Sequence, residues 1–409
     1  MTSETLKTSL KNHVDRLCEA GHRLASSPEE AAAAQYVKSE LEHLGIPVSF
    51  QRFHCPSSFA VLGLLHVALA FFGVLLITDW PVPALFVLGF TTLAYWGEFS
   101  LSWHWLRNLL PPSRSSQNVI GRYRAGMPKR TVVLVSALDS GSEGLLFRLP
   151  RQQALFLEPR QIGPMFLGFL ALSLLTLVAF VAAFGGRGWI LSVIDWCCAA
   201  VLIIYAAFFM EWLRGRPVPG ANTAAGLGLM LSLAERLKRE KAEADVIFAA
   251  LGASEINQSG ALEFANEFCP RLPKDALFLH LGPLGLGNLH VIEGEGLIFP
   301  RVYPEPELAF CTRRLLKSDE RFSSVRVSKV KCHTPVSPAV RLGFGALGCA
   351  ALGDDKIPEL SHVMGDEPEA MDFAAAEQAF DLVWELLHSP VLGFDMPRPM
   401  ASSEPEFPA

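Results

Sequence analysis

The chain contains few groupings of residues that could perform catalysis on their own. It has no H-E-x-x-H sequence, which would place two imidazoles on one helical face for zinc, and no G-x-S-x-G turn, which would expose a serine nucleophile. Ser254 follows a predicted strand, but its neighbours include no histidine base. The stretch GPLGLGN precedes no predicted helix, so it does not indicate a nucleotide site.

Histidine and cysteine side chains are the remaining candidates for a metal site. His280 lies two positions before Gly282 on a predicted strand, so both would face one side of a sheet; a packed, hydrogen-bonded histidine is the alternative. Cys332 and His333 are adjacent donors, with a surface turn as the alternative. The cysteines form no C-x-x-C pair, which favours free thiols in a reducing compartment. They are Cys18, Cys55, Cys197, Cys198, Cys269, Cys311, Cys332 and Cys349.

The composition indicates that part of the chain lies in lipid. Of its 409 residues, 50% are hydrophobic and 19% charged, whereas a soluble domain carries about 25% charged residues. The 35 basic and 41 acidic residues give a net charge of -6, which offers no broad basic face for a nucleic acid. We therefore expect a lipid bilayer, and no nucleic acid, as a partner.

Four apolar runs account for the shortage of charge. Residues 58–77 and 82–101 predict one membrane hairpin, and residues 165–184 and 189–210 predict a second, because each run can cross a hydrocarbon core of about 30 Å. The resulting segments are 1–57, hairpin one at 58–102, 103–162, hairpin two at 163–210, 211–393, and a Pro- and Ser-rich tail at 394–409 that we expect to be disordered.

Polar residues within the runs leave a second interpretation open. His66, Glu98 and Asp195 are costly in lipid and could mark a polar path through the membrane. Four helices without broken segments or repeat symmetry are not typical of a transporter, however. Location near the interface, or pairing within the bundle, is the simpler explanation.

Two hairpins return the chain to its starting side, so all the long polar segments should share one side of the membrane. Within about 15 residues of the spans, the polar segments carry many arginines, while the opposite turns carry only Arg187. The positive-inside rule therefore predicts a cytoplasmic domain with cytoplasmic termini. The arginines are Arg52, Arg107, Arg114, Arg148, Arg151, Arg160, Arg214 and Arg216.

Helix and strand signals alternate along the polar segments. Ser27 and Pro28, followed by acidic residues, predict the start of a helix that stops at Gly45. Such alternation predicts an α/β domain with a mixed, mostly parallel sheet flanked by helices. The expected strands are 46–54, 118–124, 130–136, 245–251 and 276–281, and the other expected helices are 224–241, 260–268 and 373–388.

The order of these segments resembles the aminopeptidase-type metallopeptidases of family twenty-eight. The similar pieces cover all polar segments, and they are HRLASSPEEAAAAQYVKSELEHLGIPVSFQRF, SQNVIGRYRAG, TVVLVSALDSGSEG, PGANTAAGLGLMLSLAERL, DVIFAALGASEINQSGALEFA, LFLHLGPLG and SHVMGDEPEAMD. The resemblance implies an α/β sandwich that holds two zinc ions.

Residue by residue, the chain departs from the pattern that this resemblance implies. Ala137 stands where the family has a histidine ligand, although Asp139 keeps the orienting aspartate. Asn222 replaces the aspartate that bridges the two zinc ions. Ser254 occupies the position of the general base, next to Glu255 in a ligand position.

The last two ligand positions differ in the same way. Gly282 replaces an aspartate ligand, and His362 keeps the final histidine. One ligand per metal remains, whereas enzymatic zinc sites keep three protein ligands. We therefore expect no catalytic residue, no bound zinc and no cofactor, with Asp139 and Glu255 as structural relics or binding residues.

The sequence thus predicts a multipass membrane protein with a cytoplasmic pseudopeptidase domain. Such a domain would bind a lipid, a peptide or a membrane-protein partner in the former cleft, or serve in a membrane complex. Because the second hairpin enters between Asp139 and Asn222, the cleft should open toward the headgroups. An active zinc-dependent metallopeptidase with a rearranged site is the alternative.

Overall fold

The computed structural model describes residues 3–110, 114–126, 128, 130–144, 164–186, 188–297, 301–303, 305–354 and 356–388. Its helices are α1 (Ser3–Cys18), α2 (Pro28–His43), α3 (Phe59–Leu76), α4 (Pro81–Phe99), α5 (Trp105–Leu109), α7 (Pro164–Gly185), α8 (Trp189–Leu213), α9 (Ala221–Arg239), α10 (Ser259–Phe268), α11 (Pro306–Ser318), α12 (Ser337–Arg341) and α13 (Ala374–His388). Short 3-10 turns lie at Cys269–Arg271, Glu320–Phe322 and Pro368–Ala370.

The described strands form one mixed sheet. They are β1 (Val48–Cys55), β2 (Arg114–Tyr123), β3 (Arg130–Ala137), β4 (Ala244–Leu251), β5 (Leu277–Leu281), β6 (Asn288–Glu295), β7 (Arg301–Val302), β8 (Arg326–Val330) and β9 (Gly345–Leu352). Their order is β1-β2-β4-β3-β5-β9-β6-β7, with β8 paired to β6. Strands β4, β3, β5 and β9 run parallel at the centre, while β1, β2 and β6 join antiparallel.

Helices cover both faces of this sheet. Apolar residues of α1, α2, α9 and α13 pack on one face, and those of α10 and α12 pack on the other. The centre of the sheet is β-branched and apolar because it is buried on both sides, as in the run Val132 to Val135 of β3. These two cores fix the positions at which the central strands end.

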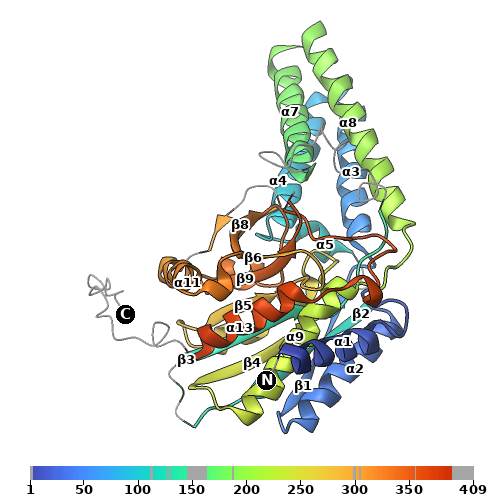
Figure 1. The fold of residues 1–409 in the computed structure, drawn as a ribbon. Coiled ribbons are helices and arrows are strands. Elements are labelled where there is room, and N and C mark those ends of the chain that lie inside the picture. Colours follow the sequence, from blue (N-terminus) through green and yellow to red (C-terminus); the bar gives the residue numbers. More distant parts are fainter. Residues whose placement is uncertain are drawn as a thin grey trace, which may run out of the picture.

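The four long apolar helices form a separate bundle at one end of the molecule. Figure 1 shows α3, α4, α7 and α8 projecting together from the α/β domain. Each is long and apolar enough to cross a membrane by length and composition, with mean hydropathies from 1.2 to 2.5. Helices α3 and α4 share their own core with α7 and α8, which includes Leu88, Leu175 and Phe209.

The predicted fold class is confirmed, and most predicted elements lie within a few residues of the observed ones. Ser27 caps α2 by accepting a bond from the Glu30 amide, and Gly45 follows that helix with a φ of +78° that favours glycine. The prediction omitted α1, α11 and strands β6 to β9. Gly345–Leu352 reads GALGCAAL, whose small residues carry a weak strand signal. The predicted tail 394–409 lies outside the described residues.

Candidate functional site

The positions singled out in the sequence lie around one edge of the sheet. The parallel strands β3, β4 and β5 end at Ala137, Leu251 and Leu281. Because the carboxyl ends of parallel strands meet at one edge, the loops that follow them converge there. We call this region the candidate site, and its residues are Ala137, Asp139, Asn222, Ser254, Glu255, Gly282 and His362.

Both carboxylate oxygens of Asp139 accept hydrogen bonds from the loop that follows β4. Its Oδ1 accepts a hydrogen bond from the Ser254 amide at 2.8 Å, and its Oδ2 accepts one from the Glu255 amide at 2.9 Å. The side chain is buried, and burial, together with the charges of Glu30 and Glu255, raises the pKa of Asp139 well above its usual range. This carboxyl group therefore holds the loop after β4 in place of orienting a histidine at Ala137.

Glu30, which was not among the predicted site residues, is a second buried carboxylate that holds the same loop. It accepts hydrogen bonds from the amides of Ala253 at 2.9 Å and Ser26 at 2.7 Å, and from the Ser116 hydroxyl. Burial raises the pKa of Glu30. The sequence does contain a signal for a structural role of Glu30, because Ser27 and Glu30 have the spacing of a capping box.

Asn222 connects three segments of the chain. Its Oδ1 accepts from the Gly285 amide at 2.7 Å, its Nδ2 donates to the Glu359 carbonyl at 2.8 Å, and its own amide donates to Asp366 at 2.7 Å. The residue is 2% exposed. An asparagine is needed for this arrangement, since a carboxylate could not donate to the Glu359 carbonyl.

Neither Ser254 nor Gly282 is placed to bind a metal ion. The Ser254 hydroxyl donates to the Leu251 carbonyl at 3.1 Å. A Cβ at Gly282 would lie 3.0 Å from the His280 ring and 3.1 Å from the Cys349 carbonyl oxygen. An aspartate ligand there would therefore displace its neighbours. Ala137, at the end of β3, is half-buried and offers no donor.

Glu255 and His362 are brought together. Glu255 Oε2 lies 3.6 Å from His362 Nε2, and His362 Nδ1 bonds the Ser142 carbonyl at 2.8 Å. The ring lies against Gly141, where a Cβ would come within 2.4 Å of it. Trp212, in the last turn of α8, contacts the same ring edge to face at 5.8 Å. The end of an apolar helix therefore borders the candidate site.

These donors do not fit a two-zinc centre. Throughout the described ranges, no group of three or more His, Cys, Asp or Glu side chains is arranged to hold a metal ion. His362 is oriented as zinc-binding histidines are, with its second nitrogen on a carbonyl. Among the described residues, however, His362 and Glu255 do not form part of a group of three donors, and zinc in enzymes takes three protein ligands.

A buried arginine joins the two ends of the segment that carries α7 and α8. Arg23 is fully buried and donates to the carbonyls of Leu138 at 3.1 Å, Pro219 at 2.9 Å and Gly220 at 2.9 Å. Those carbonyls lie after β3 and before α9. Arg23 thus fixes the exit and the return of the chain beside the candidate site, which its sequence neighbourhood did not indicate.

The loop after β4 is attached to the foot of α4 at its other end. Asn257 Nδ2 donates to Glu98 Oε1 at 2.9 Å, and Arg107 bonds the same oxygen through Nε and Nη2. Arg107 also reaches the Ser259 hydroxyl at 3.2 Å. Glu98 is 1% exposed and pairs in addition with His104. One loop therefore contacts both the candidate site and an apolar helix.

The remaining metal candidates lie elsewhere. His280 is buried, burial lowers its pKa to about 4, and its Nδ1 has no hydrogen-bond partner among the described residues, so the expected hydrogen-bonded packing is only half right. The surface turn expected for Cys332 and His333 is correct for the exposed Cys332. It is wrong for His333, whose Nε2 bonds the Phe99 carbonyl at 2.9 Å, because the turn folds against α4.

Comparison with known proteins identifies structures of similar fold but no relative by sequence. No family model matches the chain, and no curated protein matches its sequence. Its structure is similar to that of a leucine aminopeptidase precursor from Bacteroides thetaiotaomicron, with a TM-score of 0.54 and 12% identity over 94% of this chain and 97% of that chain.

Two further solved structures are similar to the same extent. A Zn-dependent exopeptidase from Parabacteroides distasonis has a TM-score of 0.54 and 11% identity over 94% of this chain and 98% of that chain. BSAP, a zinc aminopeptidase from Bacillus subtilis, has a TM-score of 0.52 and 13% identity over 93% of this chain and 95% of that chain. The α/β domain therefore has a zinc-aminopeptidase-like fold.

Proposed function

We propose that this chain is a multipass membrane protein whose aminopeptidase-like domain binds a partner and does not cut peptides. One observation carries the proposal. The polar groups at the former catalytic positions are already used by the chain itself, as the side-chain bonds of Asp139, Asn222 and Ser254 illustrate. A domain that had kept its chemistry would present these groups to a substrate and a metal.

The proposal that the four apolar helices span a membrane rests on their surfaces as well as their length. Large apolar side chains face outward along the bundle, among them Leu75, Phe86, Phe180 and Ile204. Exposed tryptophans lie near both ends, with Trp80 and Trp189 at the far turns and Trp105 at the domain end. Tryptophan is enriched where a span leaves the hydrocarbon.

The excess of arginines on the domain side supports a cytoplasmic location for that domain. Arg148, Arg151 and Arg160, and Arg187 on the opposite side, lie outside the described residues. Arg107 is used within the protein by Glu98, whereas Arg214, directly after α8, is exposed. The cytoplasmic location of the domain is part of the proposal because more arginines flank the spans on the domain side than on the opposite side.

The partner would bind where the candidate site meets the bundle. Glu255 has 36% of its side chain exposed, and it lies beside His362, whose ring contacts Trp212. An acid, an imidazole and an indole at the end of an apolar helix suit a juxtamembrane peptide segment or a lipid headgroup. Binding, unlike hydrolysis, needs neither a general base nor a bridging carboxylate.

Metal analysis and peptidase assays on purified full-length protein test the proposal together. We expect no stoichiometric zinc after equilibration with zinc, and no chelator-sensitive cleavage of amino-acid amides. Glu255→Ala and His362→Ala should then leave the background rate unchanged. About two tightly held zinc ions per chain, with cleavage that these variants abolish, would instead establish a working metallopeptidase with a rearranged site.

Photo-crosslinking tests the binding half of the proposal. A probe at Ala137 suits the experiment, because that position is half-buried, whereas Gly282 is too tightly packed to accept a probe. We expect the Ala137 probe to capture lipid or a membrane protein, and a probe at the exposed Asn12 on α1 not to do so. Capture of only soluble proteins at both positions would contradict a partner at the bundle.

A further inference from the structure

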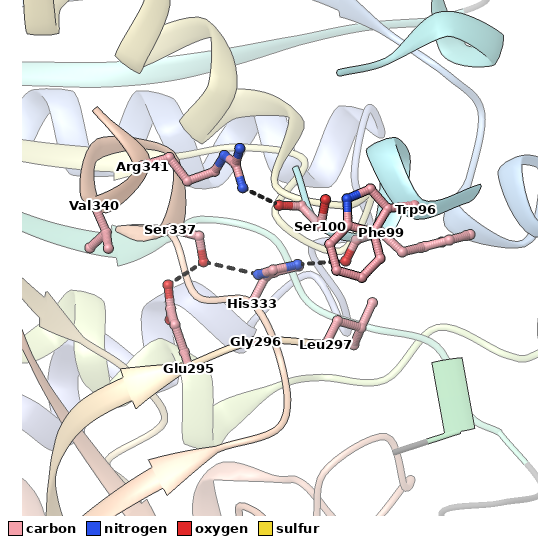
Figure 2. A pocket seen from close by; sticks show the side chains of 10 residues that line it. All are labelled: Trp96, Phe99, Ser100, Glu295, Gly296, Leu297, His333, Ser337, Val340 and Arg341. Carbon is pink, nitrogen blue, oxygen red and sulfur yellow. Dashed lines mark hydrogen bonds between the residues drawn. The ribbon is translucent and has the colours of Figure 1, made fainter. Parts of the chain in front are cut away.

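A small cavity lies where the foot of α4 meets the sheet domain, away from the candidate site. Its volume is about 40 Å³, enough for a few water molecules. Figure 2 shows its apolar wall, formed by Trp96, Phe99 and Leu297, and its polar wall, formed by Glu295, Ser337 and His333. No residue of the candidate site lines it.

The polar wall is a continuous chain of hydrogen bonds. Ser337 Oγ bonds Glu295 Oε1 on one side and His333 Nδ1 at 3.3 Å on the other (Figure 2). His333 Nε2 then bonds the carbonyl oxygen of Phe99, the last residue of α4, at 2.9 Å. The chain therefore runs from the end of β6 to the end of an apolar helix.

Counting hydrogens along this chain gives two complete arrangements. The Phe99 carbonyl can only accept, so His333 Nε2 must carry a hydrogen. If His333 is neutral, its Nδ1 accepts from Ser337, and Ser337 must accept from a protonated Glu295. If Glu295 is ionised, Ser337 donates to it, and His333 must donate from Nδ1 as an imidazolium. Both arrangements hold one titratable proton.

Loss of that proton leaves the chain incomplete. The Ser337 hydroxyl has one hydrogen, and it cannot serve an ionised Glu295 and a neutral Nδ1 at once. One of the two bonds must then be given up. We propose that Glu295, Ser337 and His333 form a proton-binding site that shares one proton, and that this proton strengthens the attachment of α4 to the sheet domain.

The surroundings of Glu295 support proton binding near neutral pH. The carboxyl accepts from the Tyr303 hydroxyl and the Thr334 amide, both at 3.1 Å, and the described residues place no lysine or arginine in a salt bridge with it. Burial raises the pKa of Glu295 to about 7 against these hydrogen bonds.

The other ionisable groups nearby have partners or are neutral. Glu293, two residues earlier on β6, pairs with Arg313 of α11. Arg341 lines the same cavity but donates to the Ser100 carbonyl at 2.7 Å. Burial raises the pKa of Tyr303 well above its usual range. Burial of the sulfur and the charge of Glu295 raise the pKa of the Cys332 thiol to about 12, although the residue as a whole is exposed. On the other side of the foot of α4, Glu98 pairs with Arg107 and His104. Glu295 and His333 are the ionisable groups within the chain of hydrogen bonds that ends at Phe99.

Infrared difference spectroscopy of the full-length protein in lipid nanodiscs tests the shared proton. We expect a carbonyl band of a protonated carboxylic acid that titrates near pH 7 and is absent in Glu295→Gln. His333→Gln copies only the neutral imidazole, with an acceptor toward Ser337 and a donor toward Phe99. It should therefore confine the proton to Glu295 and enlarge the band. The matched control, Glu293→Gln, should leave the band unchanged.

A band that survives Glu295→Gln, or one that His333→Gln does not enlarge, overturns the shared site. Hydrogen exchange over residues 97–104 tests the attachment of α4. Corrected for intrinsic rates, wild-type exchange at pH 8.5 should be about fivefold faster than at pH 6, the ratio for a lost hydrogen bond of about 1 kcal/mol. In Glu295→Gln the two rates should agree. An equal pH dependence in both proteins overturns control by the proton.

Discussion

Asn222 shows how one atom decides what a position can do. Its Nδ2 donates to the Glu359 carbonyl, and its backbone amide donates to the Asp366 carboxyl group. Replacing the amide with a carboxylate would remove that donor and add a charge beside Asp366. The position is therefore a structural connector.

We expect Asn222→Asp to destabilise the protein by about 2 kcal/mol and to bind no zinc, because one buried hydrogen bond is lost and two carboxylates then face each other. Thermal unfolding in detergent measures the effect, and Asn12→Asp on the exposed face of α1 is the matched control. Stability equal to wild type together with stoichiometric zinc would show instead that the metal site is merely one substitution from function.

Asp366 should make stability depend on pH between about 4 and 6. Burial raises its pKa to about 6 in the folded protein, while an unfolded aspartate titrates near about 3.9. The folded state therefore holds a proton that the unfolded chain releases, so this contribution is complete below about pH 4 and is lost as the pH rises through about 6.

We expect Asp366→Asn to remove this dependence, on the order of 2 kcal/mol across that range, since the amide oxygen can still accept from Asn222. Unfolding midpoints at pH 4, 5, 6 and 7 provide the measurement. Asp354→Asn is the control, because 93% of that side chain is exposed. Parallel pH profiles for wild type and Asp366→Asn would rule this source out.

At the scale of elements, the loop between β4 and α10 joins the sheet to the bundle. Its first residues are held by Asp139 and Glu30, and Asn257 is held by Glu98. Ala253, Asn257 and Gln258 adopt positive φ angles of 48°, 48° and 58°, which non-glycine residues rarely do without such support. A movement of α4 would therefore shift this loop and, with it, the residues of the candidate site.

We expect Arg107→Ala to destabilise the protein by about 3 to 5 kcal/mol, because it leaves the buried Glu98 carboxylate without its cation. Hydrogen exchange should increase in residues 252–260. Arg326→Ala, which removes an exposed pair with Asp354, should cost at most about 1 kcal/mol. The double variant Arg107→Ala with Glu98→Gln also removes the carboxylate charge. If this double variant is no more stable than Arg107→Ala alone, the unpaired charge is not the cause of the destabilisation.

At the scale of the whole molecule, the α/β domain sits at one end of the bundle (Figure 1). The turns that join α3 to α4 and α7 to α8 lie at the other end. This arrangement suits two hairpins that enter and leave a membrane on the same side. The arginine count of the sequence then predicts which side that is.

We expect a thiol reagent that cannot cross membranes to modify Asp79→Cys, in the turn between α3 and α4, on intact cells. It should modify Asn12→Cys only after permeabilisation. Both positions are exposed, and both variants would carry Cys197→Ser and Cys332→Ser to remove the exposed native thiols. Labelling of Asn12→Cys alone on intact cells would reverse the proposed orientation.

The sequence alone determined the features that depend on local pattern. Apolar runs of span length, the cap of α2 and the β-branched run in β3 each reflect nearest neighbours along the chain, so the four apolar helices and the α/β class could be predicted. The residues of the candidate site could be named only through the resemblance to a family, although most of them follow a strand or begin a helix. The small-residue strand β9 could not be predicted, because the segments that bury it are distant in the sequence.

Only the tertiary structure decided what those residues do. That Asn222 serves Glu359 and Gly285, that Glu30 joins Asp139 on one loop, and that His333 reaches Phe99 all depend on contacts across more than 60 residues of sequence. A side chain's hydrogen bonds and pKa depend on what is buried around it. Burial in this chain is set by packing between segments that local sequence cannot pair.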